Sequence, residues 1–146
     1  MAIDFSLTPE LEAIRLRIRT FVDEVIKPEE AKLQGKDGGE PLEGKARNEI
    51  LVALRKKAHA EGIWLPHMPE EWGGMGLGHV ELAMVQAEAA KSYYGPWVFN
   101  CQAPDEGNMH TLLHWATPEQ AEKYLKPLCK GCLLYTSDAA DEGLGV

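Results

Sequence analysis

Apolar residues recur at steps of three and four near the start of the chain, a spacing that predicts an amphipathic helix. The stripe consists of Leu11, Ile14, Ile18, Phe21, Val22 and Val25. Thr8 followed by Pro9 favours a helix start, because the Thr hydroxyl caps free N–H groups and Pro loses no hydrogen bond in the first turn. Pro28 is expected to end this helix a residue or two after Ile26.

Further stretches carry the same helical period. The sequence predicts helices over residues 45–61, 79–91 and 104–115. A fifth helix starts at Thr117, because Gln120 stands three residues after this capping Thr. In the helix over 79–91, the side chains expected to face the interior are Val80, Ala83, Met84, Ala87 and Ala90. Gly62 is expected to end the helix before it, since Gly adopts the left-handed conformation at low cost.

Two stretches rich in Gly and Pro connect these helices. Residues 33–44 are expected to form a loop. Residues 63–78 form a longer irregular connection, which should be ordered because it carries apolar side chains that need burial. These side chains are Ile63, Trp64, Leu65 and Trp72. No segment before Gly131 has the period of a strand, so the predicted fold class is all-α, a bundle of about five helices.

Composition narrows the class of protein further. The 146 residues are 45% hydrophobic and carry a formal net charge of -8, which suits one compact domain. No run of 18 or more apolar residues exists, and the first six residues lack the basic and apolar regions of a signal peptide, so we expect a cytoplasmic protein without a membrane span. An acidic chain without a basic face also argues against nucleic acid as a partner. Three cysteines are too few for a disulfide framework.

Two residue pairs have the spacing of metal ligands. Cys129 and Cys132 form a C-x-x-C pair, but structural zinc needs four ligands and the chain has no second pair. His110 and His114 would share one face of a helix, without an obvious third ligand. We therefore expect no metal site. Instead of binding a metal, the two histidines are expected to form local hydrogen bonds.

Two other patterns resemble functional motifs only in part. The glycines over residues 73–78 are similar to a phosphate loop, but no strand precedes them, which favours a turn. The neighbouring carboxylates Glu70 with Glu71 and Asp105 with Glu106 point apart if they are helical. Residue types alone thus indicate no catalytic set.

Three segments together carry a family resemblance. The first is the opening helix over residues 5–28, and the second is the loop Pro69-Glu70-Glu71-Trp72-Gly73-Gly74-Met75-Gly76. The third covers residues 95–109, and the likeness continues through residues 117–128. With these segments the chain resembles, over residues 4 to 131, the amino-terminal helical domain of acyl-CoA dehydrogenases, in the branch that contains members ten and eleven.

The resemblance implies a flavin enzyme that introduces an α,β double bond into an acyl-CoA and passes electrons to an electron-transfer flavoprotein. In that family the FAD-binding β domain and the carboxylate base follow the present segment. The resemblance therefore implies no catalytic residue and no FAD bound by residues 1–131 alone, and a homo-oligomer for the intact parent. The amino-terminal domain would supply one wall of the acyl pocket, from Trp97, Asn100, Ala103 and Gly107. The alternative for Trp97 is plain core packing.

Residues 132–146 break the family pattern. The string from Cys132 to Glu142 resembles the translation of a transposase sequencing adapter, and Gly145 and Val146 fit its continuation. We therefore expect residues 1–131 to be the domain, from a truncated parent, and residues 132–146 to be read-through without fixed structure. A second hypothesis from another class remains, a stand-alone helical module that docks a partner protein and has no catalytic activity.

Overall fold

A computed structural model describes residues 7–131 of the chain. The adapter read-through and unstructured tail expected over residues 132–146 lie outside the described residues. The described part consists of helices and their connections, without a strand, which confirms the all-α class. Apart from one 3₁₀ turn, residues 7–131 form six continuous helices where about five were predicted, because Gly95–Val98 forms an additional single-turn helix, α5.

The first helix begins as predicted and continues further than predicted. Thr8 caps α1 (Pro9–Phe21) and accepts a hydrogen bond from the Leu11 N–H at 3.3 Å. The expected end near Pro28 is wrong, because a π-helical turn (Val22–Ile26) leads directly into α2 (Lys27–Leu33).

The π-helical turn explains how the helix passes Pro28. The Lys27 N–H donates to the carbonyl of Val22, five residues back. Widening the turn relieves the clash that a proline ring makes with the carbonyl four residues earlier, so the helix continues. The same arrangement recurs where the Lys126 N–H donates to the carbonyl of Ala121, immediately before Pro127.

The second predicted helix and the long connection after it are both confirmed. Helix α3 (Gly44–Ala60) is followed by Gly62 at φ 66°. The connection over residues 63–78 contains one 3₁₀ turn (Glu70–Trp72). Its Ile63, Trp64 and Leu65 side chains are buried, and Trp72 is half-buried. These side chains hold the connection to the core.

Helix α4 (His79–Ala89) forms where predicted but presents a different face to the core. Its buried residues are Val85, Glu88 and Ala89, whereas Val80 is 64% exposed. The predicted inward stripe is also wrong for Ala83, Ala87 and Ala90, which are exposed, whereas Met84 is half-buried. The reason is that the carboxylate of Glu88 turns inward to meet cations of α1.

The last third of the chain forms a helical hairpin. Helix α6 (Asp105–Trp115) confirms the prediction over 104–115. Thr117 and Gln120 form a reciprocal capping box at the start of α7 (Pro118–Gln120). A π-helical turn (Ala121–Leu125) and α8 (Lys126–Cys129) continue that helix without a break.

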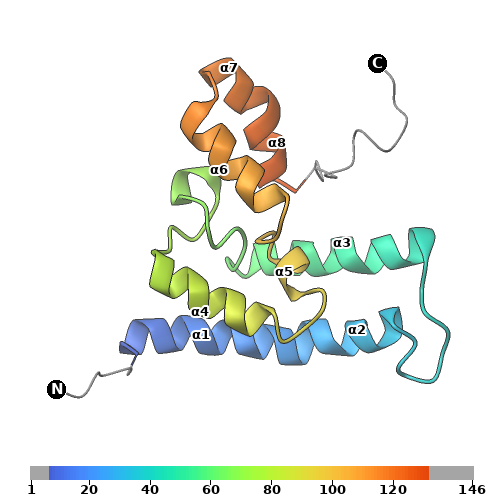
Figure 1. Cartoon of the computed structure of the whole chain (residues 1–146). Helices are drawn as coiled ribbons and strands as arrows, with labels where there is room; N and C mark the ends of the chain where they lie inside the picture. Colours follow the sequence, from blue (N-terminus) through green and yellow to red (C-terminus); the bar gives the residue numbers. More distant parts are fainter. Residues whose placement is uncertain (1–6, 132–146) are drawn as a thin grey trace.

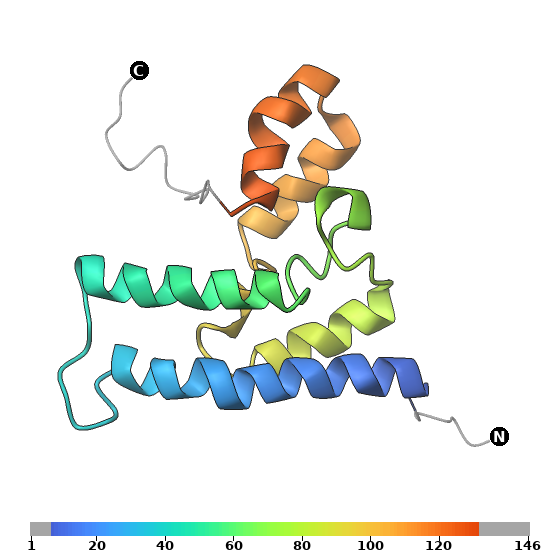
Figure 2. The same ribbon diagram turned by 180° about the vertical axis from the view of Figure 1, so that it is seen from behind.

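Figures 1 and 2 show two bodies of helices that meet at the centre of the molecule. In one body α4 packs on α1, and α3 lies alongside the continuous α1–α2 helix. In the other body α6 packs against the α7–α8 helix. None of the described helices combines the length and the apolar character needed to cross a membrane.

Each body has its own hydrophobic cluster. The lower cluster contains Ile18, Phe21, Val22, Ile26, Leu33, Leu51, Leu54, Ala58, Ile63, Val85, Ala89, Tyr94, Val98, Phe99 and Cys101. The upper cluster contains Trp64, Leu65, Met68, Met109, Leu125, Leu128 and Cys129.

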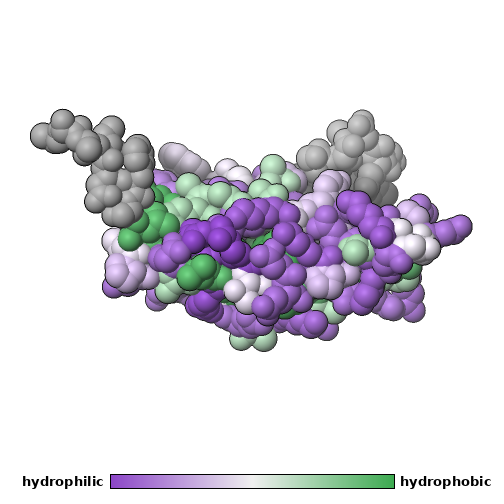
Figure 3. Space-filling model, turned by 90° about the horizontal axis from the view of Figure 1, so that it is seen from below, coloured by the Kyte–Doolittle hydropathy of each residue, from purple (hydrophilic) through white to green (hydrophobic). Residues whose placement is uncertain are grey.

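Seen from the side of α1 and α2, the surface is mainly hydrophilic with separate apolar patches (Figure 3).

Candidate functional site

Asn100 lies where the two bodies meet and connects four parts of the chain. Its side chain is 1% exposed, and its backbone has the left-handed φ of 55°. Its Oδ1 accepts a hydrogen bond from Arg55 Nη2 at 2.9 Å, and its Nδ2 donates to the Leu128 carbonyl at 3.3 Å. Its own carbonyl lies 3.0 Å from His67 Nε2. Every polar side-chain atom of Asn100 therefore has a partner within the protein.

Arg55 of α3 is the second central residue. Its guanidinium lies 4.0 Å from the Trp97 ring centroid and 5.2 Å from the Trp64 ring centroid. Its Nε donates to the Trp97 carbonyl at 3.1 Å. Burial lowers the pKa of Arg55 to about 10, although Asp105 opposes this shift, so the group stays charged at neutral pH. The guanidinium thereby holds both ends of the segment from Trp97 to Asn100, through the Trp97 carbonyl and the Asn100 side chain.

The four residues predicted to line an acyl pocket occupy two environments. Trp97 is half-buried and Asn100 is buried, and Arg55 bonds to both. Ala103 and Gly107 are exposed at the start of α6, and a Cβ added to Gly107 would meet no atom within 4 Å. Their role in binding an acyl chain remains a prediction.

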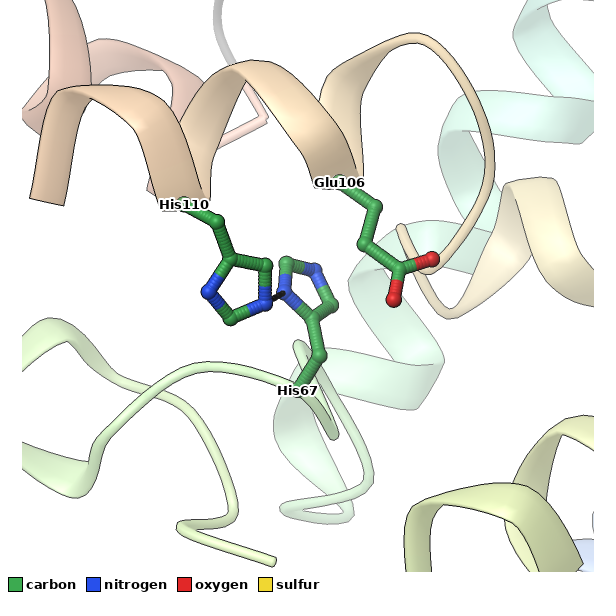
Figure 4. A group of neighbouring side chains, drawn as sticks. All are labelled: His67, Glu106 and His110. Atoms are coloured by element: carbon green, nitrogen blue, oxygen red, sulfur yellow. Dashed lines mark hydrogen bonds between the residues drawn. The ribbon is translucent and has the colours of Figure 1, made fainter. Parts of the chain in front are cut away.

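Three side chains whose polar atoms could together hold a metal ion lie near Asn100. His67 comes from the connection after α3, whereas Glu106 and His110 come from one face of α6 (Figure 4). His67 Nδ1 lies 3.2 Å from His110 Nε2. The ligand atoms of all three side chains lie within 4.8 Å of one another. The Gln86 amide donates to both oxygens of Glu106, at 3.3 and 3.2 Å.

The environment keeps the His67 imidazole neutral. Burial lowers its pKa to about 4, the hydrogen bond with the Asn100 carbonyl raises it in part, and His110 lowers it further. His67 is 6% exposed, and His110 is half-buried. A neutral imidazole is the form that ligates metals.

Sequence reasoning paired His110 with the wrong neighbour. His114 is exposed and does not belong to the group. The neighbour of His110 is His67, 43 residues earlier, which helical spacing does not reveal. Of the C-x-x-C pair, Cys132 lies outside the described residues, and burial raises the pKa of the Cys129 thiol to about 11.

The glycine-rich loop over residues 73–78 is a turn, as predicted. Gly73 ends the 3₁₀ turn with φ 83°. A Cβ on Gly74 would lie 2.0 Å from the Met68 carbonyl oxygen, so close packing requires glycine there. Glu70 and Glu71 are exposed.

A half-open hollow of about 510 Å³ lies beside Trp64, between the connection over residues 63–78 and the α7–α8 helix. Trp64 and Trp72 form its apolar part, and Glu71, Glu122 and Lys126 are among its charged residues. None of the four predicted pocket residues lines it. The hollow and the predicted acyl wall are thus separate surfaces in the described part of the chain.

Comparisons with known proteins identify the fold. The family model described as acyl-CoA dehydrogenase, N-terminal domain, matches residues 8–132. Acyl-CoA dehydrogenase family member 11 from Homo sapiens is 31% identical over 136 residues, which is 87% of this chain and 16% of that relative. Family member 10 from Mus musculus is 32% identical over 130 residues, 86% of this chain and 12% of that protein.

A solved structure agrees with these sequence relatives. It is a putative acyl-CoA dehydrogenase from Mycobacterium abscessus, with a TM-score of 0.69 and 28% sequence identity, and the match covers 94% of this chain and 38% of that one. The chain therefore spans less than half the length of each of these proteins. Over nearly all of its described length, the chain belongs to the acyl-CoA dehydrogenase family, whose N-terminal domain it carries.

Proposed function

We propose that this chain is the N-terminal helical domain of a longer, flavin-dependent acyl-CoA dehydrogenase and that it supplies one wall of the acyl pocket. The family match supports this assignment, because the matched model is that of the N-terminal domain. The coverage of 12 to 16% of the mammalian relatives agrees with one domain of a larger enzyme. The domain alone is expected to be inactive.

The reaction would be α,β-dehydrogenation of an acyl-CoA thioester, with electrons passed on to an electron-transfer flavoprotein. The flavin would accept the hydride and a carboxylate would remove the α-proton, both from parts of the enzyme outside residues 7–131. The described residues do not suit FAD themselves. We expect this because the flavin-binding β domain of the family follows the present segment.

The pocket proposal rests on a difference in burial along residues 97–107, where Asn100 is buried and Ala103 and Gly107 are exposed. The Asn100 side chain is hydrogen-bonded to Arg55 and to the Leu128 carbonyl, and these bonds fix the backbone at residue 100. Ala103 and Gly107, three and seven residues further along the chain, are small and exposed. Such a surface suits an alkyl chain, because small side chains allow close approach without clashes. Asn100 would act as a positioning residue there.

Two matched variants of the full-length enzyme test the pocket. Gly107→Leu adds a side chain where the domain leaves open space, so the fold should tolerate it. Ala53→Leu places the same side chain on the exposed face of α3. We expect Gly107→Leu to lower kcat/KM for long acyl-CoA substrates more than for short ones, and Ala53→Leu to change neither. Equal effects of both variants on all chain lengths would exclude Gly107 from the pocket.

Sequencing of the source DNA across codon 131 by a library-free method tests the domain boundary. An open frame that continues into further domains supports the proposed parent and identifies residues 132–146 as read-through. A stop codon after Val146 would favour the alternative, a stand-alone interaction module. An exposed apolar stripe on α4, with Val80, Ala83 and Ala87, agrees with docking of another domain or protein.

Partners and location belong to the same proposal. The intact enzyme would act on acyl-CoA as a homo-oligomer in the cytoplasm. Cell fractionation and size-exclusion chromatography of the full-length protein test both points. A membrane-bound or monomeric enzyme would contradict them.

A further inference from the structure

The two imidazoles of His67 and His110 are spaced as ligands of one ion. Their facing nitrogens lie 3.2 Å apart. Two nitrogens bound to a tetrahedral zinc ion at about 2.0 to 2.1 Å are about 3.3 Å from each other. The separation of the two nitrogens is therefore the one that a shared tetrahedral ion requires.

The hydrogen bond between His67 and the Asn100 carbonyl determines which ring nitrogen carries the lone pair. The Asn100 carbonyl accepts but cannot donate, so the hydrogen of the neutral His67 ring is on Nε2, 3.0 Å away. The lone pair is then on Nδ1, which faces His110. Donation of the second ring N–H to a backbone carbonyl is the usual support of a metal-binding histidine.

Glu106 is the candidate third ligand, and it projects from the same helix as His110. It precedes His110 by one helical turn, and Figure 4 shows both side chains on the face of α6 that approaches His67. One of its carboxylate oxygens and one nitrogen of each imidazole lie within 4.8 Å of one another, so coordination would require the Glu106 side chain to move closer. Gln86 donates to this carboxylate and would hold it when it binds an ion.

We propose that His67, Glu106 and His110 bind one Zn²⁺ ion, in contrast to our expectation from the sequence that the chain has no metal site. Two imidazoles and a carboxylate are a ligand set that zinc accepts, and they leave a fourth position for water. Glu106 and His110 are only half-buried, so the ion can enter from solvent. The ion would tie the connection after α3 to α6. This inference does not depend on the proposed acyl pocket.

Metal binding to the full 146-residue chain tests the proposal. The purified chain is stripped with a chelator and titrated with Co²⁺, followed by its visible absorption, and with Zn²⁺ in competition with a chromophoric chelator. His110→Ala and Glu106→Gln remove one ligand each at half-buried positions that tolerate change. His114→Ala is the matched control, because it removes an exposed histidine one turn further along α6.

We expect one ion per chain. The cobalt-loaded chain should show the visible absorption bands of a tetrahedral site with nitrogen and oxygen ligands, and no charge-transfer band from a thiolate ligand. His110→Ala and Glu106→Gln should weaken zinc binding by more than about 10-fold, since even outer partners of metal ligands contribute that much. Zinc should raise the melting temperature of the original chain and of His114→Ala, but not of His110→Ala. Absence of a cobalt band, thiolate charge transfer, or equal loss of binding in His114→Ala would overturn the assignment.

Discussion

Asn100 shows how one side chain can set the path of a whole segment. A non-glycine residue with φ near 55° is uncommon, and Asn is among the residues that tolerate it. Here the amide also satisfies Arg55 and the Leu128 carbonyl, which lie on different bodies of the fold. The residue therefore combines an unusual backbone conformation with a connection between elements far apart in the sequence.

Replacement of Asn100 should separate these two contributions. Asn100→Ala removes the amide and keeps a Cβ in a strained conformation, so the free energy of unfolding should fall by about 2 to 3 kcal/mol. Asn100→Gly removes the same hydrogen bonds without the backbone penalty and should be about 1 kcal/mol more stable than Asn100→Ala. Urea denaturation followed by circular dichroism measures both, with exposed Asn48→Ala as a control expected within about 0.5 kcal/mol of the original chain.

Glu88 gives the fold a pH dependence that the residue type alone does not predict. Burial raises the pKa of Glu88, but hydrogen bonds from Arg19, Lys91 and Arg15 outweigh it and lower the pKa to about 2. Because the folded pKa lies below the ordinary value of 4.5, the stabilisation is present above that value and is lost as pH falls from 4.5 toward about 2.

Glu88→Gln should therefore lower the free energy of unfolding at pH 7 by about 2 kcal/mol, since it removes the carboxylate that Arg15, Arg19 and Lys91 share, although Arg15 keeps its ion pair with Glu12. The difference from the original chain should shrink as pH falls through that window, as measured by urea denaturation at several pH values. Glu49→Gln, on an exposed position of α3, should follow the original chain at every pH. A constant difference down to pH 2 would show that Glu88 does not act through its charge.

At the scale of elements, helix starts were easier to predict than helix ends. Thr8 and Thr117 cap helices with the local partners expected of them, because capping involves residues two or three positions apart. Pro28 did not end its helix, because a π-helical turn accommodates it. The buried face of α4 was also missed, since the cations that pair with Glu88 belong mostly to α1.

Two glycines in different elements should respond to alanine in opposite directions. Gly74→Ala would place a Cβ 2.0 Å from the Met68 carbonyl oxygen, so we expect a loss of more than about 3 kcal/mol. Gly107→Ala meets no atom within 4 Å inside α6 and should stabilise the chain by about 0.5 to 1 kcal/mol. Thermal denaturation of both variants beside the original chain measures the contrast. Stabilisation by Gly74→Ala would contradict the packing of this loop.

At the scale of the whole molecule, the two hydrophobic clusters should open separately. The lower cluster is centred on α1, α3 and α4, and the upper cluster on α6 and the α7–α8 helix. Asn100 connects the two bodies, because its side chain accepts a hydrogen bond from Arg55 of α3 and donates one to the Leu128 carbonyl of α8. Local opening is expected where few buried apolar contacts join two parts.

Leu125→Ala should destabilise the upper cluster by about 2 to 5 kcal/mol, because the buried side chain leaves a cavity. Amide hydrogen exchange should then accelerate in α6 and the α7–α8 helix before α1 and α4. Leu54→Ala, an equally buried change in the lower cluster, should give the reverse order. Uniform acceleration in both variants would mean that the domain opens as one unit.

The sequence by itself determined the fold class, most helix positions and the family, because helical period, caps and a local loop motif all act between residues close in the chain. The tertiary structure decided which faces are buried and which side chains meet. Arg55 stacks on Trp64 and on Trp97, and Trp97 lies 42 residues further along the chain. His67 faces His110, which lies 43 residues further along. Such contacts depend on how helices pack, which no spacing along one element records.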